Sequence, residues 1–186
     1  MIHFDTRCFN YVIVSSTTYG TWLPGDTRGF VSKTVNGLHN EFDTPCDAVI
    51  PALKAYSEHN LKEPPVLFNS EQANLILTRW RRVAPEVGWH LFAAAIMSNH
   101  FHVVLASPIG QTKEDYLRTL KARASFSLNK KYGKRTWWTT SGSVRYCFDE
   151  HSLNTRIEYV MNQKNPLIVW RNPDEFALHN NKESEM

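Results

Sequence analysis

Two strongly apolar stretches, separated by only two polar residues, constrain the fold of this chain more than any other feature of its sequence. The first stretch covers residues 88–97, Ser98 and Asn99 interrupt it, and the second covers residues 100–107. Short apolar runs bounded by turn residues are typical of buried strands, and a brief break between two such runs is typical of a hairpin. The sequence therefore predicts two adjacent antiparallel strands joined by a tight turn.

Hydrophobic patterns on either side of this hairpin predict further strands and helices. β-Branched and alternating residues predict strands at 9–17 and 144–148. Apolar residues at helical spacing predict helices over residues 71–83, from residue 112 to about residue 132, and from residue 149 to just before Pro166. The order of these elements predicts an α+β fold with a central antiparallel sheet and helices packed on it.

Short polar side chains mark where the predicted helices begin. Ser70, Thr112 and Asp149 each stand directly before a helical pattern, where a side-chain oxygen can accept a hydrogen bond from the first turn. Asp115 follows Thr112 by three residues and completes a pattern similar to a capping box. Pro85 is expected to end the first of the three helices, because proline cannot donate a backbone hydrogen bond.

The length and composition of the chain suit one domain. With 186 residues and 42% apolar content, residues 1–173 can form a single core. Residues 29–70 are predicted to be a long surface insertion with a short helix near residues 52–59, and residues 174–186 a polar tail. We expect a cytoplasmic protein with no membrane partner, because no apolar run approaches roughly 18 residues and no secretory signal is visible. Three cysteines without a CxxC pair argue against a disulfide framework.

Basic residues are concentrated in one part of the chain, although the net charge is only +3. Between residues 113 and 135 there are eight basic residues and two acidic ones, whereas the rest of the chain is more acidic than basic. Because phosphates attract cations and unpaired bases stack on aromatic rings, this strip predicts a surface for single-stranded nucleic acid. The predicted DNA contacts, from this strip and the two tryptophans that follow it, are Arg118, Lys121, Arg123, Lys130, Lys131, Lys134, Arg135, Trp137 and Trp138. The alternative is a solvated helix face followed by two core tryptophans.

Two histidines stand at the start of the second hairpin strand. Side chains alternate along a strand, so His100 and His102 lie on one face and Phe101 on the other. A pair of imidazoles with this spacing can bind one metal ion between them. Two ordinary histidines are the alternative, because a His-x-His motif alone is a weak signal.

A tyrosine and a glutamine share one face of the last predicted helix. Tyr159 and Gln163 are four residues apart, which places them on neighbouring turns. At about 100° per residue, that face points away from the apolar face formed by Leu153 and Ile157. The helix could therefore present a phenol and an amide along the edge of a site, and the alternative is an exposed tyrosine beside a solvated glutamine.

Several motifs resemble one family of DNA-processing enzymes. The sequence AIMSNHFHVVL at residues 95–105 resembles the HUH motif of the single-tyrosine transposases of bacterial insertion sequences, which include the REP-associated tyrosine transposases and form the IS200-like superfamily. IEYVMNQ at residues 157–163 resembles their nucleophile helix. YGTWLPGD at residues 19–26 and LKA at residues 120–122 are similar to one branch of the family. The resemblance covers about residues 11–163 in the same order.

The resemblance implies a fold, a cofactor and a reaction. It implies a ferredoxin/RRM-like HUH fold in which His100, His102 and Gln163 hold one divalent cation, Mg²⁺ or Mn²⁺, against a phosphate of single-stranded DNA. Such an ion would neutralise charge that develops during cleavage. Tyr159 would attack phosphorus and form a covalent 5′-phosphotyrosine, and attack by a second 3′-hydroxyl would rejoin the strands.

The resemblance also implies how DNA is bound. It places Trp22 and Arg28 beside a DNA hairpin or its flanking bases, whereas turn chemistry with Trp22 packed on the core is the alternative. The long segment at residues 29–70 departs from compact family members. That departure leaves both a homodimer and a monomer compatible with the sequence.

Three functions compete for this chain. The first is a metal-dependent single-stranded DNA endonuclease and strand transferase, and the second is a domesticated protein that binds hairpin DNA with little or no cleavage. The third is a metal-binding barrel of the cupin kind, which would need more strands and further ligands. The joint presence of both histidines, Tyr159 and Gln163 favours the first.

Overall fold

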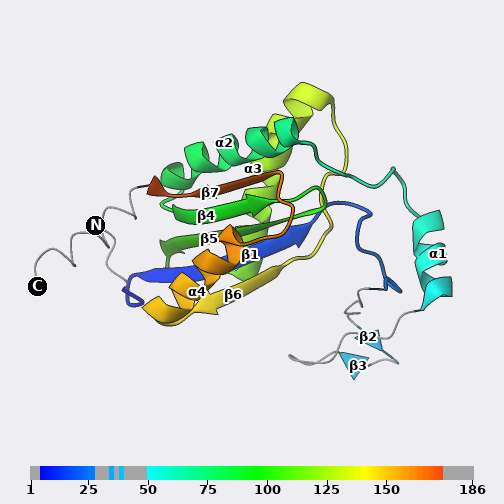
Figure 1. Ribbon diagram of the computed structural model, residues 1–186. Coiled ribbons are helices and arrows are strands. Elements are labelled where there is room, and N and C mark those ends of the chain that lie inside the picture. The colour runs from blue at the N-terminus through cyan, green and yellow to red at the C-terminus, as the bar shows by residue number, and fades with distance from the viewer. Residues whose placement is uncertain (1–4, 28–33, 36–37, 40–49, 174–186) are drawn as a thin grey trace, which may run out of the picture.

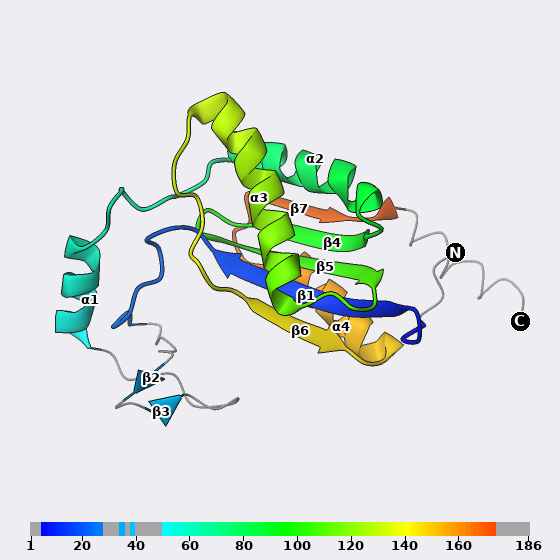
Figure 2. The same ribbon diagram turned by 180° about the vertical axis from the view of Figure 1, so that it is seen from behind.

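A five-stranded sheet forms the centre of the computed structural model, which describes residues 5–27, 34–35, 38–39 and 50–173 (Figures 1 and 2). Its strands are β1 (Phe9–Thr17), β4 (His90–Ile96), β5 (His100–Pro108), β6 (Ser143–Cys147) and β7 (Ile168–Arg171). The helices are α1 (Pro51–His59), α2 (Ser70–Glu86), α3 (Lys113–Tyr132) and α4 (Glu150–Met161), and a separate short pair consists of β2 (Thr34–Val35) and β3 (Leu38–His39). The predicted α+β fold is therefore confirmed.

The strand order places β5 in the middle of the sheet. The order is β6-β1-β5-β4-β7, and every neighbouring pair is antiparallel. The predicted hairpin is β4–β5, closed by a hydrogen bond of 2.9 Å from the backbone N–H of Met97 to the carbonyl of His100. In the β1–β5 register, Ser15 faces His102 and Thr17 faces His100. The central position of β5 thus brings β1 side chains beside both histidines.

Helices cover the two faces of the sheet differently. α2 and α3 pack on one face, and α4 packs on the other (Figures 1 and 2). Phe101 faces α2 and α3, where its ring packs edge-on against Trp80 at a centroid distance of 4.9 Å. The indole N–H of Trp80 donates to the carbonyl of Leu120, so this buried polar group is satisfied. The alternation of β5 therefore buries Phe101 in one core and turns both histidines toward the α4 side.

Side-chain caps set the helix starts, with one difference from the prediction. Thr112 and Asp149 cap α3 and α4 as expected, and Thr112 forms the predicted capping box with Asp115. The cap of α2, however, is Asn69 rather than Ser70, because its side chain accepts a hydrogen bond of 2.9 Å from the N–H of Gln72. The N-cap position thus lies one residue earlier than the sequence pattern suggested.

One helix end and one strand differ from the prediction. α2 continues through Pro85 to Glu86, because a proline near a helix end loses only one hydrogen bond and its fixed φ still suits the helix. β7 was not predicted at all, since its four residues follow Pro166 without a clear alternation. β7 becomes a strand by pairing with β4, where Val169 lies opposite Ala95.

The region predicted as an insertion is partly built into the core. α1 occupies the place of the predicted short helix. Val66 and Phe68, near the end of the predicted insertion, are buried in the core beneath α2 and α3. The rest of residues 29–49, apart from the β2–β3 pair, and the predicted tail at 174–186 lie outside the described residues. Within the described ranges, no helix combines the length and hydropathy that a membrane crossing requires.

Two distant segments hold the turn of the β4–β5 hairpin. The N–H of Phe68 donates to the carbonyl of Ser98 at 2.7 Å. The N–H and the hydroxyl of Thr18 both donate to the carbonyl of Asn99, at 2.9 and 3.1 Å. The residue directly before His100 is therefore anchored by the loop that follows β1.

Candidate active site

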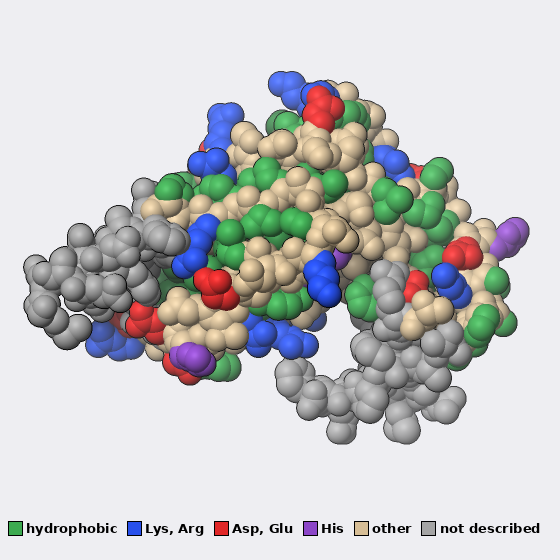
Figure 3. All heavy atoms as spheres, in the orientation of Figure 1, with side chains coloured by type: hydrophobic (Ala, Val, Ile, Leu, Met, Phe, Trp, Pro, Cys, Tyr) green, Lys and Arg blue, Asp and Glu red, His purple; other side chains and the backbone are tan. Residues whose placement is uncertain are grey.

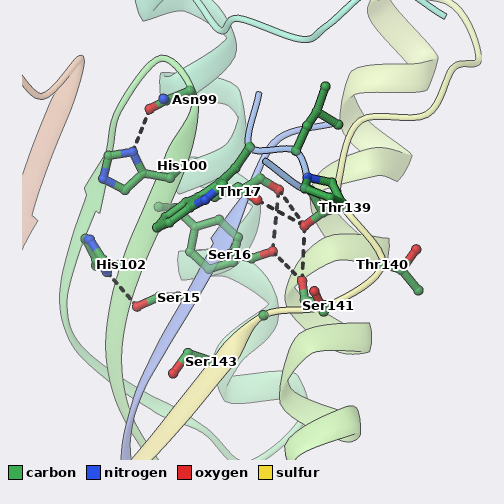
Figure 4. Close-up of a pocket in the computed structure, with 15 residues that line it drawn as sticks. Ser15, Ser16, Thr17, Asn99, His100, His102, Thr139, Thr140, Ser141 and Ser143 are labelled. Carbon is green, nitrogen blue, oxygen red and sulfur yellow. Dashed lines mark hydrogen bonds between the residues drawn. The ribbon is translucent and has the colours of Figure 1, made fainter. Parts of the chain in front are cut away.

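The histidine pair lies at the start of the central strand. The imidazole centroids of His100 and His102 are 5.1 Å apart, and the ring planes are inclined by 80°. Both side chains lie on the same side of a cleft, together with Ser15 and Asn99 (Figure 4). The alternation predicted from the sequence therefore brings the two rings together.

Each histidine is oriented by a neighbouring polar side chain. Nδ1 of His100 lies 2.6 Å from Oδ1 of Asn99, and Nδ1 of His102 lies 2.6 Å from the hydroxyl of Ser15. In both cases Nε2 is the nitrogen that the ring would offer to a metal ion. Metal-binding histidines usually make such a bond through their second nitrogen, because it fixes the ring orientation.

Burial keeps His102 in the form that binds metals. Desolvation, and to a smaller extent the nearby charge of His100, together lower the pKa of His102 to about 4. The neutral imidazole, which is the metal-binding species, therefore predominates at neutral pH.

Tyr159 approaches the histidine pair from α4. Its ring centroid lies 5.3 Å from that of His102, with the planes inclined by 71°. Ile157 and Val160 on the same helix are buried against the sheet, whereas the Tyr159 side chain is 48% exposed. The predicted separation between the apolar face of the helix and the tyrosine is confirmed, and the phenol and both imidazoles belong to one chain.

Gln163 lies beyond the helix rather than on it. α4 ends at Met161 with Asn162 as its C-cap, so the predicted position of Gln163 on the helix face was wrong. The side-chain amide of Gln163 donates to the carbonyl of Tyr159 at 2.9 Å, and this leaves Oε1 as its potential ligand atom. Within the described ranges, no three His, Cys, Asp or Glu side chains form a cluster that could hold a metal.

A cleft of about 710 Å³ opens beside the histidines. It is lined by residues 15–17, 22–24, 99–102 and 139–143, and we call it the Ser/Thr cleft. Figure 4 shows His100 and His102 on one side, Thr139 and Ser141 on the other, and Thr17 between them. Its volume falls in the range of about 300–1,000 Å³ that is typical of ligand sites.

Some cations of the predicted basic strip have partners within the protein, and others do not. Most of α3 lies on the opposite face of the sheet from α4, so the strip does not flank the histidine pair (Figure 2). Four of its cations have acidic or backbone partners: Arg118 pairs with Asp115, Lys131 with Glu71 and Arg135 with Glu63, and Lys121 donates to three carbonyls. Within the described part of the chain, the side chains of Arg123, Lys130 and Lys134 form no ion pair or hydrogen bond.

The face that carries α4 is not strongly basic either. Lys and Arg side chains are interspersed there with Asp and Glu (Figure 3). One example is Arg171, which pairs with Glu158 at 3.0 Å. Electrostatic attraction for DNA on this face is therefore not set by one continuous cationic patch.

Two of the three tryptophans that were predicted to contact DNA are buried instead. Trp137 and Trp138 are only 3% and 7% exposed, because they pack with Phe68 in the core beneath α2 and α3. The alternative of two core tryptophans is therefore the correct one. Trp22, by contrast, is 42% exposed and lines the Ser/Thr cleft. Arg28 lies outside the described residues.

A comparison with sequence families decides what kind of protein carries this geometry. The family described as "Transposase IS200 like" matches residues 61–163, more than half of the chain, and the match includes both histidines and Tyr159. The chain belongs to the IS200-like transposase family. No curated protein matches this IS200-like transposase.

Two solved structures are similar to this IS200-like transposase at low sequence identity. One is described as a REP-associated tyrosine transposase bound to a REP hairpin, with 9% identity, a TM-score of 0.44, and coverage of 87% of this chain and 68% of that one. The other is a putative transposase from Deinococcus radiodurans R1, with 14% identity, a TM-score of 0.42, and coverage of 89% and 98%.

Sequence reasoning missed how the site of this IS200-like transposase is supported. Ser15 contacts the ring of His102, and Lys121 holds the segment at residues 139–141. Each contact joins residues far apart in the sequence, so no local pattern indicates it. Asn99 had a usable signal, because it directly precedes the histidine that it contacts. The hydroxyl-rich run at residues 139–143 gave no signal, since its role depends on the sheet that brings it beside β1.

Proposed function

We propose that this protein cuts single-stranded DNA and rejoins it through a covalent 5′-phosphotyrosine on Tyr159. The observation that carries the proposal is the 5.3 Å between the ring centroids of Tyr159 and His102, within one chain and beside a second histidine. Membership of a transposase family supports a reaction on DNA. A hairpin-bearing single strand is the substrate that the resemblance implies.

The donor set fits a divalent cation. His100 and His102 are oriented through Nδ1, burial keeps His102 neutral, and Gln163 has an amide oxygen available as a third ligand. We propose that these three residues hold Mg²⁺ or Mn²⁺. When bound, the ion polarises a phosphate oxygen and neutralises charge that develops in the transition state. With two imidazoles and one amide as ligands, such an ion would still have positions for phosphate and water.

The chain itself supplies the nucleophile and its orientation. The exposed phenol oxygen of Tyr159 forms a bond to phosphorus while the bond from phosphorus to the 3′ oxygen breaks. The phenol loses its proton to solvent, and the departing 3′ oxygen gains one from solvent. The phosphodiester bond is exchanged and not hydrolysed, so attack by another 3′-hydroxyl regenerates the phenol and joins two strands.

Labelled oligonucleotides test this mechanism directly. With Mn²⁺ or Mg²⁺, a hairpin-bearing single strand labelled at its 3′ end becomes protein-linked, because Tyr159 retains the 5′ phosphate of the downstream fragment. The same strand labelled at its 5′ end gives a shorter free fragment. Tyr159→Phe abolishes both products, while Tyr146→Phe, at another exposed tyrosine, leaves them unchanged.

Two results would overturn the proposal. One is an adduct of undiminished yield in Tyr159→Phe, which would move the nucleophile elsewhere. The other is tight hairpin binding without any adduct in either metal, which would establish the binding-only alternative.

A further inference from the structure

Apart from the histidine pair, the described residues that line the Ser/Thr cleft carry no charge. Among the described residues that line it, there is no Asp, Glu, Lys or Arg, and only His100 and His102 can titrate. Phosphate groups favour cations, whereas bases favour flat apolar faces with hydrogen-bonding groups nearby. The lining of the cleft therefore fits a nucleobase better than a phosphate.

Trp22 gives the cleft an aromatic surface. Its side chain is 42% exposed and lines the cleft beside Leu23 and Pro24. Hydroxyl side chains from Thr17, Thr139 and other residues line the remainder. An aromatic plate together with short hydroxyl side chains suits a single unpaired base, because every base has a stacking face and polar edges.

The wall opposite the histidines is held in place by hydrogen bonds from α3 and β1. The Lys121 ammonium donates to the carbonyls of Thr139 and Ser141, each at 2.7 Å, and the Ser16 hydroxyl donates to the same Ser141 carbonyl at 3.0 Å. At Gly142, an added Cβ would lie only 2.7 Å from the carbonyl oxygen of Ser15. The cleft is thus preformed, which reduces the entropy lost when a ligand binds.

The histidine pair separates the cleft from the nucleophile. His102 lines the cleft and also contacts Tyr159, whereas Tyr159 is not one of the described lining residues. In phosphoryl transfer the attacking and leaving oxygens lie roughly in line on opposite sides of phosphorus. With phosphate held at the histidines and Tyr159 on one side, the leaving nucleotide lies on the cleft side.

We infer that the Ser/Thr cleft holds the base of the nucleotide that leaves with the free 3′-hydroxyl, stacked against Trp22. This inference rests on the proposed function and adds a subsite to it. Contacts within the cleft then help to select which base the protein accepts immediately 5′ of the cleaved bond.

Abasic substitution tests the inference. The adduct assay with wild-type protein first maps the cleaved bond. Binding is then measured with Tyr159→Phe, which cannot react, and with single strands that carry one abasic site on either side of that bond. An abasic site on the 5′ side is expected to weaken binding about tenfold. The effect of an abasic site on the 3′ side is expected to be the same whether or not Trp22 is present.

A double-substitution comparison identifies Trp22 as the stacking residue. Trp22→Ala in the Tyr159→Phe background also weakens binding about tenfold, and combining it with the 5′ abasic site adds little more. Trp22→Phe retains most of the affinity, and Phe148→Ala, at an aromatic residue that is 81% exposed on the surface, has no effect. Thermal unfolding verifies that each variant is folded.

The outcomes separate this inference from the proposed function. Normal adduct formation with additive effects of Trp22→Ala and the abasic site overturns the inference alone. Coupling to the 3′ base instead overturns the assignment to the leaving nucleotide. Failure to form any adduct overturns the proposed function and the inference together.

Discussion

The ammonium group of Lys121 lies 2.7 Å from the carbonyl oxygen of Ser141, although the two residues are 20 positions apart. It also donates to the carbonyl of Thr139, so a single side chain of α3 fastens the segment that precedes β6. Sequence alone gave Lys121 as a DNA contact, but its geometry is that of a structural cation. The cleft wall therefore depends on a residue from the opposite face of the sheet.

Lys121→Met is expected to destabilise the fold and loosen that wall. The substitution removes charge-assisted hydrogen bonds to the carbonyls of residues 139–141 and lowers the free energy of unfolding by about 1–3 kcal/mol. Urea denaturation measures the change. Lys130→Met is the matched control, because Lys130 is exposed on the same helix, and its effect should stay within about 0.5 kcal/mol. Equal effects at the two positions would contradict the structural role of Lys121.

Phe101→Ala is expected to lower stability far more than the loss of an exposed ring. Phe101 stands between the two histidines in the sequence, but its ring is fully buried against Trp80 on the other face of the sheet. Truncation therefore leaves a cavity and costs about 3–5 kcal/mol. Phe148→Ala, at a surface position, should cost less than about 1 kcal/mol. Chemical denaturation of both variants under the same conditions gives the comparison, and a small loss for Phe101→Ala would place the ring outside the core.

The stability of the metal-free protein is expected to fall as pH drops from about 6.5 toward 4. The folded pKa of His102 is lowered to about 4 from the ordinary 6.5, so over this interval the unfolded chain binds a proton that the folded chain does not. The loss can reach about 3 kcal/mol. Urea midpoints measured between pH 4.5 and 7 should show this slope in wild type and a smaller slope in His102→Gln.

The cause of the low pKa can be tested separately. In an NMR titration, His100→Gln is expected to raise the pKa of His102 only in part, because burial is the larger cause and the charge of His100 the smaller one. His151→Gln, at an exposed histidine of α4, serves as the control. Full recovery of the ordinary value in His100→Gln would instead make charge repulsion the main cause.

Mixing two inactive variants tests whether one chain carries a complete site. Tyr159 and His102 contact each other within one chain, so a mixture of Tyr159→Phe and His102→Ala is expected to form no protein–DNA adduct. In the control, each variant is mixed with wild-type protein, which shows whether the variant inhibits adduct formation. An adduct in the double-variant mixture would mean that a tyrosine from one copy serves the histidines of another.

Local signals predicted much of the fold. The caps Thr112 and Asp149 and the β4–β5 hairpin depend on residues close together in sequence, and all three are confirmed. His100 and His102 fell on one face because strand alternation is a local rule. Tyr159 was correctly separated from the buried face of its helix for the same kind of reason.

The errors arose where tertiary contacts decide the outcome. β7 is a strand only because β4 offers it a partner. Trp137 follows a run of cations, but contacts with Phe68 bury it. The basic strip looked continuous in the sequence, whereas Glu71 pairs with Lys131 across 60 residues and Glu63 pairs with Arg135 from an even earlier position. None of these partners can be identified from a local pattern.

The anchoring of the β4–β5 turn has a consequence for when the site forms during folding. The carbonyl of Asn99 receives hydrogen bonds from Thr18, across a separation of 81 residues, and Ser98 is held by Phe68. Contacts that close such long loops form late, since the entropy of loop closure must be overcome first. An isolated hairpin could align His100 with His102 but would lack these anchors. The candidate site is therefore completed only when the whole sheet has closed. Under the proposed mechanism, a partly folded chain would not present a reactive tyrosine to DNA.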